Sequence, residues 1–177
     1  LGVELPIEQV PLIQKQLIRK SLHRAKPVIV ATQMMESMMD RIKPNRSEIT
    51  DVANAVLEGA DAVMLSGETA TGKHPVLVVE TISDAICYNA CKLSRDTKAE
   101  ALIGMTQSGY TAFMLSSYRP ESPIYIFSKE KSLINQLSLS WGVRAFHYSE
   151  EESLDDIMSD QIQILKERGF IKPGDLV

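Results

Sequence analysis

Two short apolar segments that end in polar residues constrain the fold of this chain more than any other feature. The first occupies residues 27–37 and the second occupies residues 61–69. Apolar, partly β-branched runs of this length predict strands that are buried on both faces of a parallel sheet. Parallel α/β sheets and TIM barrels place their chemistry at the carboxyl ends of strands. We therefore expect an active-site rim formed by the polar residues that follow the two runs, Thr32, Gln33, Ser66, Gly67 and Glu68.

The segments around these two runs have the periodicity of helices. A first helix is expected over residues 7–24, and its inward stripe is expected to comprise Val10, Ile13, Leu17 and Ile18. Asn45 and Glu48 predict a capping box at the start of a second helix, which Gly59 ends. Helix and strand therefore alternate with short links, a pattern that favours parallel pairing and right-handed crossovers.

A second alternating unit follows residues 72–96, which are largely apolar and helical and contain no flexible linker. Strands are expected over residues 101–105, 124–127 and 143–148, with another beginning near Asp175. Helices are expected over residues 110–118, 132–141 and 154–168. This alternation predicts a small parallel three-layer α/β domain of three to four strands.

A turn rich in hydroxyl groups joins the first strand of this second unit to its helix. Its residues are Thr106, Gln107, Ser108, Gly109, Tyr110 and Thr111. Free backbone amides and the helix dipole make such a helix start suitable for binding a phosphate. Ser and Thr are also ordinary N-cap residues, so the pattern leaves both interpretations open. The chain contains neither a P-loop sequence nor a Gly-x-Gly-x-x-Gly sequence.

Composition and charge exclude several other classes of protein. The formal net charge of −4 argues against binding to nucleic acid or to an anionic membrane. No apolar run is long enough to span a bilayer. Cys87 and Cys91, the two cysteines of the chain, have no His or Cys near them in sequence, which favours reduced thiols over a metal site.

Several longer stretches closely resemble the pyruvate kinase family. These are residues 1–4, 31–38, 51–69, 108–112, 118–120 and 141–143. The resemblance extends over the whole chain. It implies the last strands of a catalytic TIM (β/α)8 barrel over residues 1–81, followed by the family's regulatory α/β domain, truncated, over residues 82–177.

This resemblance also implies an activity and a set of site residues. Members of the family transfer a phosphoryl group from phosphoenolpyruvate to ADP in glycolysis, giving pyruvate and ATP with Mg²⁺ and usually K⁺. The expected catalytic residues are Thr32, Ser66 and Glu68, and the expected substrate-binding residues are Gly2, Thr32 and Gln33. A general acid near Thr32 would act through ordered water, because a threonine hydroxyl is too weakly acidic alone.

Regulation, assembly and location follow from the same resemblance. The turn at residues 106–111 matches the family loop that binds an activating phosphate, so a sugar-phosphate or nucleotide effector is expected. Gln107, however, stands where members activated by sugar bisphosphates often carry Lys. A cytoplasmic homotetramer is also implied.

The resemblance further implies that this chain lacks part of the catalytic machinery. The family's metal-binding Asp would directly precede Leu1, and its other charged catalytic groups would lie further upstream. Phosphoryl transfer depends on those charges, so we expect no metal site in these residues and no turnover by the 177 residues alone. The link at residues 79–83 is also shorter than the family pattern, which suggests a missing segment there.

Two alternatives to an enzyme fragment of this family remain at the level of sequence. The chain is compatible with a non-catalytic module that binds phosphorylated metabolites through the turn at residues 106–111. Another TIM-barrel enzyme would share the polar strand ends but not the long motifs. From the residues alone, structural cap or turn roles for Thr32 and Ser66 are as well supported as functional ones.

Overall fold

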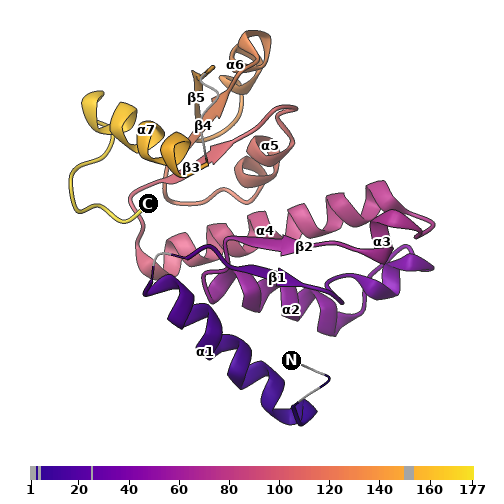
Figure 1. Cartoon of the computed structure of the whole chain (residues 1–177). Helices are drawn as coiled ribbons and strands as arrows, with labels where there is room; N and C mark the ends of the chain where they lie inside the picture. Colours follow the sequence, from indigo (N-terminus) through magenta and orange to yellow (C-terminus); the bar gives the residue numbers. More distant parts are fainter. Residues whose placement is uncertain (1–2, 4, 25, 150–153) are drawn as a thin grey trace. The chain divides into compact units, whose positions relative to one another are not determined.

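The computed structural model describes residues 3, 5–24, 26–149 and 154–177. The chain divides into two compact units, Leu1–Asn89 and Ala90–Val177, and each is described by itself below. Figure 1 shows how the helices and strands of each unit are arranged. Among the described helices, none is both long enough and apolar enough to cross a membrane.

The first unit alternates helix and strand in the order that the sequence predicts. Its first elements are η1 (Ile7–Gln9), α1 (Val10–Leu22), β1 (Ile29–Ala31) and η2 (Glu36–Met39). They are followed by α2 (Arg46–Leu57), β2 (Ala62–Met64), α3 (Gly67–Ala70) and the first part of α4 (Pro75–Thr97). Strands β1 and β2 pair in parallel, with Val30 opposite Val63, so the predicted parallel pairing is confirmed.

One face of this two-stranded sheet packs against helices. Val30 of β1 is buried in a cluster that also contains residues of α1, α2 and α4 (Figure 1). The buried members of the cluster are Ile18, Val30, Met34, Met35, Met38, Val52, Ala55, Val78, Ile82 and Ala85. Burial of this apolar surface is the main favourable contribution to the folding of the unit.

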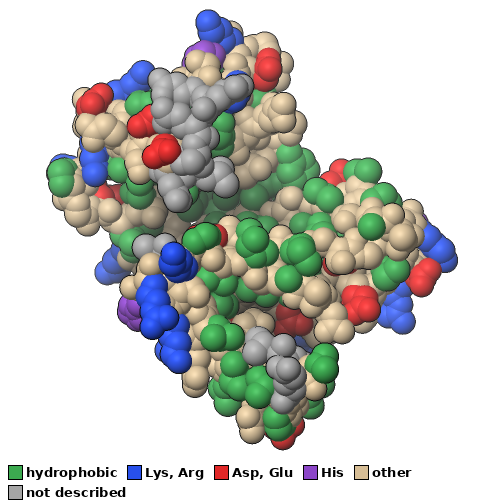
Figure 2. Space-filling model, in the orientation of Figure 1, with side chains coloured by type: hydrophobic (Ala, Val, Ile, Leu, Met, Phe, Trp, Pro, Cys, Tyr) green, Lys and Arg blue, Asp and Glu red, His purple; other side chains and the backbone are tan. Residues whose placement is uncertain are grey.

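The expectation that these strands are buried on both faces is wrong for the described structure. Ile29 is 64% exposed and Met64 is 41% exposed, although both belong to paired strands. The reason is that α1, α2 and α4 cover only the face on which Val30 lies. Hydrophobic side chains accordingly reach the visible surface of the first unit in Figure 2.

The local signals in α2 are confirmed, whereas the predicted stripe of α1 is too wide. Asn45 and Glu48 form the expected capping box, and Gly59 has a φ of +85° just after the helix. In α1, however, Ile18 is buried and Leu17 is 45% exposed. Helix α1 therefore contacts the core along a narrower strip than its apolar residues indicate.

The second unit is built around a three-stranded parallel sheet. Its elements after α4 are β3 (Leu102–Met105), α5 (Tyr110–Ser117), β4 (Ile124–Ser128), α6 (Lys131–Leu137), β5 (Val143–His147) and α7 (Leu154–Glu167). The strand order is β3-β4-β5, and all five residues of the central strand β4 are buried. Burial on both faces is typical of a parallel sheet that is covered by helices.

Two predicted elements of this unit differ from the structure. No strand forms at Asp175, whose carboxylate accepts the Lys172 amide at 2.7 Å in a turn. A single backbone bond, from Glu100 N to Leu176 O at 2.8 Å, is too little for a strand pairing. Helix α6 ends at Leu137 rather than near Trp141, and the Ser138 hydroxyl bonds back to a carbonyl there, as is common at helix ends.

Helix α4 is one continuous helix from Pro75 to Thr97. It covers most of residues 72–96, which the sequence predicts to be largely helical. The two compact units divide between Asn89 and Ala90, inside this helix. The boundary expected between residues 81 and 82 stays a prediction.

Candidate functional site

The polar residues predicted to form a rim lie at one edge of the β1–β2 sheet. Ala31 is opposite Met64 at the carboxyl ends of the two strands. Thr32 follows β1 and Ser66 follows β2, and both residues are exposed. The register therefore brings the loops after both strands to the same edge, as expected for parallel neighbours.

The backbone at the end of β1 is strained at two consecutive residues. Thr32 has a φ of 70° and Gln33 has a φ of 58°. The left-handed region is uncommon for residues other than Gly, and a β-branched residue such as Thr is an outlier there. Each such residue costs about 1–3 kcal/mol, and such strain is concentrated at active sites and ligand-binding sites.

Glu68, one of the predicted rim residues, has its side chain turned inward beneath the rim. Its side chain is buried, with the residue only 2% exposed. One carboxylate oxygen, Oε1, accepts the Met35 amide at 3.4 Å, and the other, Oε2, accepts the Ser66 amide at 3.0 Å. Glu68 thus connects the loop after β1 to the loop after β2.

A second buried carboxylate, Glu48, binds the same loop from α2. Glu48 accepts the Ser37 amide at 2.7 Å and the Asn45 amide at 2.8 Å, and it also accepts the Ser37 hydroxyl. From the sequence, Glu48 was expected only to cap the helix. Its contact with Ser37 could not be predicted, because nothing in the sequence indicates which loop faces the cap.

An exposed ion pair also connects the two loops. Lys73 Nζ lies 2.8 Å from the Asp40 carboxylate, and the Lys73 amide donates to Met39 O at 2.8 Å. The hydrogen bond and charge of Lys73 lower the pKa of Asp40, while the same contact raises the pKa of Lys73. η2 and α3 also pack closely, since the site where a Cβ of Gly67 would lie is 3.4 Å from the Met39 sulfur.

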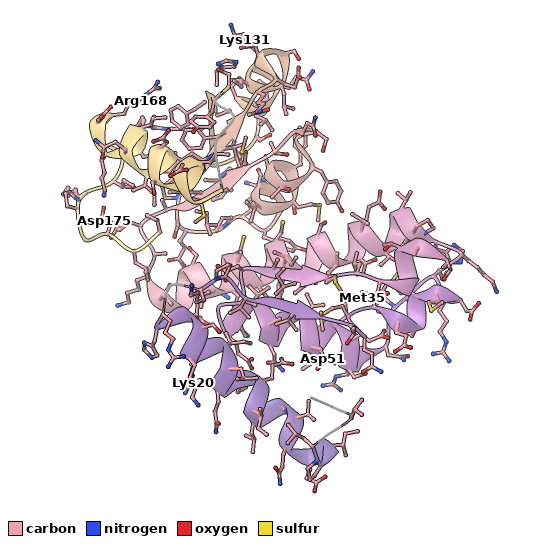
Figure 3. All side chains as sticks on the ribbon, in the orientation of Figure 1. Lys20, Met35, Asp51, Lys131, Arg168 and Asp175 are labelled. Carbon is pink, nitrogen blue, oxygen red and sulfur yellow. The ribbon has the colours of Figure 1, made fainter. Side chains whose placement is uncertain are left out.

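The methionines of the first loop fill the space beneath the rim. Met34, Met35 and Met38 are 5%, 0% and 0% exposed, and Figure 3 shows Met35 within the first unit. All three belong to the buried cluster of the first unit. Gly2, the expected partner of a substrate carboxylate, lies outside the described residues.

The predicted phosphate-binding turn of the second unit starts α5. Gly109 has a φ of +88°, and its amide donates to the Thr106 hydroxyl at 3.0 Å. The Tyr110 amide donates to the Ser108 hydroxyl at 3.4 Å. Two amides that were expected to be free are therefore already occupied, because hydroxyl groups next to a helix start readily cap it. Gln107 and Thr111 complete the turn, and Gln107 is exposed.

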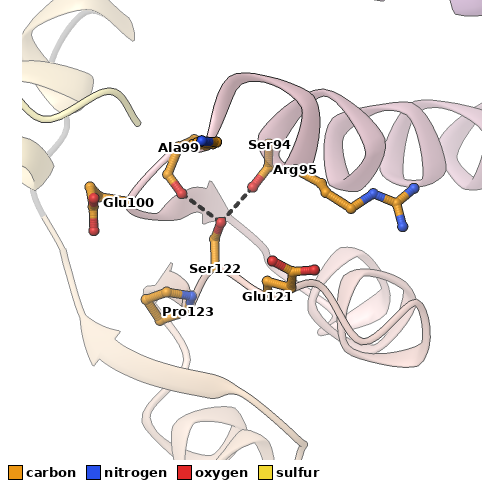
Figure 4. Close-up of a pocket in the computed structure, with 8 residues that line it drawn as sticks. Ser94, Arg95, Ala99, Glu100, Glu121, Ser122 and Pro123 are labelled. Atoms are coloured by element: carbon orange, nitrogen blue, oxygen red, sulfur yellow. Dashed lines mark hydrogen bonds between the residues drawn. The ribbon is translucent and has the colours of Figure 1, made fainter.

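A shallow cavity of about 220 Å³ lies at the opposite end of β3, between the end of α4 and the start of β4 (Figure 4). Ser122 Oγ is 2.6 Å from Ala99 O and 2.7 Å from Ser94 Oγ. Since Ser122 uses its single hydrogen for Ala99 O, Ser94 donates to Ser122. Arg95 and Glu121 also line this cavity. Nothing in the sequence predicted a cavity at this place.

Within the described residues, no cluster of His, Cys, Asp and Glu side chains has the composition of a metal site. Cys87 and Cys91 are buried, unbridged thiols, and burial raises the pKa of Cys91. The chemistry available at the rim is therefore that of hydroxyl groups, amides and two buried carboxylates.

Comparison with protein families matches both units. The barrel domain of pyruvate kinase matches residues 1–79, and the α/β domain of pyruvate kinase matches residues 84–177. The crystal structure of a pyruvate kinase from Cryptosporidium parvum has a TM-score of 0.51 and 34% sequence identity. That similarity covers 99% of this chain and 42% of the other.

Curated relatives give the same result. The pyruvate kinase of Clostridium acetobutylicum is 37% identical over 205 residues, covering 100% of this chain and 43% of the relative. The pyruvate kinase of Mycobacterium tuberculosis H37Rv is 40% identical over 201 residues, again covering 100% and 43%. This chain therefore spans less than half the length of these relatives. The fold, the family matches and the sequence identity together show that this chain belongs to the pyruvate kinase family.

Proposed function

We propose that this chain supplies part of the substrate site of a pyruvate kinase, which transfers a phosphoryl group from phosphoenolpyruvate to ADP. The chain covers 43% of its curated relatives, so the activity requires further parts of the enzyme. The observation that carries the proposal is the strained turn at Thr32 and Gln33, at the sheet edge that also carries Ser66. Strain of this kind is typical of residues that position a ligand.

The rim residues have separate roles in this proposal. Thr32 and Gln33 bind the substrate, together with the backbone at Gly2. The Thr32 hydroxyl acts through ordered water when the enolate is protonated to pyruvate, since its own acidity is too low. Ser66, which follows β2, lines the same rim.

Metal ions enter the proposal only at the level of the family. Pyruvate kinases generally use Mg²⁺ and K⁺, which supply positive charge to the transferring phosphoryl group. The described residues form no metal site by themselves, so we assign no metal ligand here. We further propose a cytoplasmic homotetramer, on the strength of the family match to both domains.

A first experiment separates the contribution of this chain from that of the whole enzyme. We would assay pyruvate formation by the 177-residue chain and by a hybrid in which it replaces the matching region of the Mycobacterium tuberculosis enzyme. We expect turnover by the hybrid and none by the isolated chain. A folded hybrid without turnover, or turnover by the chain alone, would contradict the proposal.

Thr32→Val in the hybrid tests the rim directly. Valine keeps the β-branched shape and removes the hydroxyl, so we expect kcat to fall by about 10²–10⁴-fold, as for loss of a proton-transfer group. Thr50→Val is the matched control, because the Thr50 hydroxyl bonds the Arg46 carbonyl at 3.0 Å within α2. Equal kcat values for the two variants would exclude a role for the Thr32 hydroxyl.

The turn at residues 106–111 supports a second, compatible function, the binding of a phosphorylated effector. The turn places several hydroxyl groups at the start of α5, and these groups are what supports phosphate binding, since the Gly109 and Tyr110 amides already bond to Thr106 and Ser108. Titration of the chain with fructose 1,6-bisphosphate and with AMP, followed through the amide signals of Gly109 and Thr111, would test this. Saturable shifts with either compound are expected, and their absence with both would remove the effector site from the proposal.

A further inference from the structure

We infer that Glu48 and Glu68 are positioning residues, which hold the turn at Thr32 and Gln33 in its strained conformation. The inference depends on the proposed function for what the turn binds, but not for how it is held. The sequence did not predict this role for either residue. It placed Glu68 among the catalytic residues of the rim and Glu48 in a helix cap.

The two carboxylates bind the same short segment at two points. Glu68 accepts the Met35 amide and Glu48 accepts the Ser37 amide, so the backbone is fixed two residues apart. These contacts begin only two residues after Gln33. A left-handed conformation at residues other than Gly persists only where the surrounding structure fixes it, and these bonds supply that restraint.

Each carboxylate also anchors the segment to a different element. Glu68 accepts the Ser66 amide at 3.0 Å and so connects the segment to the end of β2. Glu48 accepts the Asn45 amide at 2.8 Å and connects it to the start of α2. The segment is thereby held between the end of β2 and the start of α2.

Both carboxylates are satisfied by amide and hydroxyl donors rather than by a cation. Glu48 is 7% exposed and Glu68 is 2% exposed, and neither forms an ion pair within the described residues. A carboxylate is an acceptor at both oxygens, and both Glu48 and Glu68 accept a backbone amide at each oxygen. Hydrogen bonds to a charged acceptor are also stronger than neutral ones, so they can offset the strain of the turn.

Amide hydrogen exchange in the 177-residue chain tests this inference without any need for activity. Glu48→Gln and Glu68→Gln keep the side-chain shape but place an NH₂ group against backbone donors. We expect exchange at Ser37 and Met35, respectively, to accelerate by about tenfold to a hundredfold, as for the loss of a hydrogen bond to a charged group. The α2 amides of Val52 and Ala55 should remain unchanged.

Glu58→Gln is the matched control for these two variants. Glu58 follows the same helix as Glu48, and its carboxylate lies 3.2 Å from Lys15 with one buried oxygen unpartnered. We expect this variant to leave exchange at Met35 and Ser37 unchanged. A uniform acceleration throughout the first unit in Glu48→Gln or Glu68→Gln would show a general structural role and overturn the inference.

Kinetics of the hybrid enzyme provide the second readout. Glu48→Gln and Glu68→Gln should lower kcat by about tenfold or more, because small displacements of a positioning group are costly. KM for ADP should stay the same, and Glu58→Gln should change neither constant. A loosened turn with unchanged kcat would overturn the positioning role. An inactive unsubstituted hybrid would instead contradict the proposed function and leave the exchange pattern to decide the inference.

Discussion

Gly109 offers a quantitative test of how the second unit is built. This residue has a φ of +88°, and a Cβ added to it would lie 2.8 Å from Leu133 Cδ1 and 3.1 Å from Phe113 Cε2. Leu133 is buried, so a shift of its side chain must disturb the packing around it, whereas Phe113 is 46% exposed and can move more readily. Gly109→Ala should therefore be destabilised both by the backbone conformation and by the contact with Leu133.

The two contributions can be estimated separately. An L-residue in the left-handed region costs about 1–2 kcal/mol, of which about 0.4–1 kcal/mol is offset because Ala gives the unfolded chain less conformational entropy to lose on folding. Overpacking of a buried side chain adds about 1–3 kcal/mol. The free energy of unfolding of the second unit should thus fall by about 1–5 kcal/mol in Gly109→Ala.

Trp141 makes this measurement possible, because it is the single tryptophan of the chain and lies in the second unit. Urea unfolding followed by its fluorescence reports on that unit. Gly169→Ala is the control, since Gly169 has a φ of +74° and no atom within 4 Å of a Cβ placed there. It should cost only about 1 kcal/mol, the backbone contribution.

A double variant then isolates the contact with Leu133. In a Leu133→Ala background the added Cβ of Gly109→Ala meets no side chain at 2.8 Å, so its extra cost should largely disappear. Coupling energies of about 1–3 kcal/mol are usual for residues in direct contact. If Gly109→Ala costs no more than Gly169→Ala, the packing argument is refuted.

Three further predictions concern single groups. Gln161 is 3% exposed and its Nε2 has no partner among the described residues, so Gln161→Leu should raise thermal stability by about 1 kcal/mol; a lower melting temperature would contradict this. Lys73 lowers the pKa of Asp40, so the stability from this pair is present above the ordinary value of 3.8 and is lost as pH falls through the lowered pKa. A carboxyl titration by NMR should show this lowered pKa, and Lys73→Met should return it toward 3.8. Asn45→Ala removes the cap of α2 and should cost about 0.5–2 kcal/mol in urea unfolding; an unchanged midpoint would show that the cap is dispensable.

The parts of the fold that depend on local chemistry were predictable from the sequence. The capping box at Asn45 and Glu48 depends on two side chains three residues apart, and it forms as expected. The buried strand β4 and its parallel neighbours follow from apolar runs separated by helical patterns. Such features require no knowledge of what covers each surface.

Features that depend on tertiary contacts were not predictable in the same way. The apolar residues of β1 predicted burial on both faces, but Ile29 is exposed because the described helices cover one face. The position of Glu68 on the rim was predicted, whereas its inward direction depends on the Met35 and Ser66 amides that it accepts. Sequence spacing gives the edge of the sheet but not the direction of a side chain beyond the last strand residue.

Two of the left-handed turns of the molecule differ in a way that bears on function. At the start of α5 the left-handed position is occupied by Gly109, which adopts it at no steric cost. At the end of β1 the chain has Thr32 and Gln33 instead, although glycine would adopt both conformations more readily. Thr32 and Gln33 thus place a hydroxyl and an amide where the backbone conformation costs free energy. Two buried carboxylates hold the adjoining segment in place. This combination is expected where side chains must be presented in one fixed geometry, and it is the physical argument for our proposal that the end of β1 binds substrate.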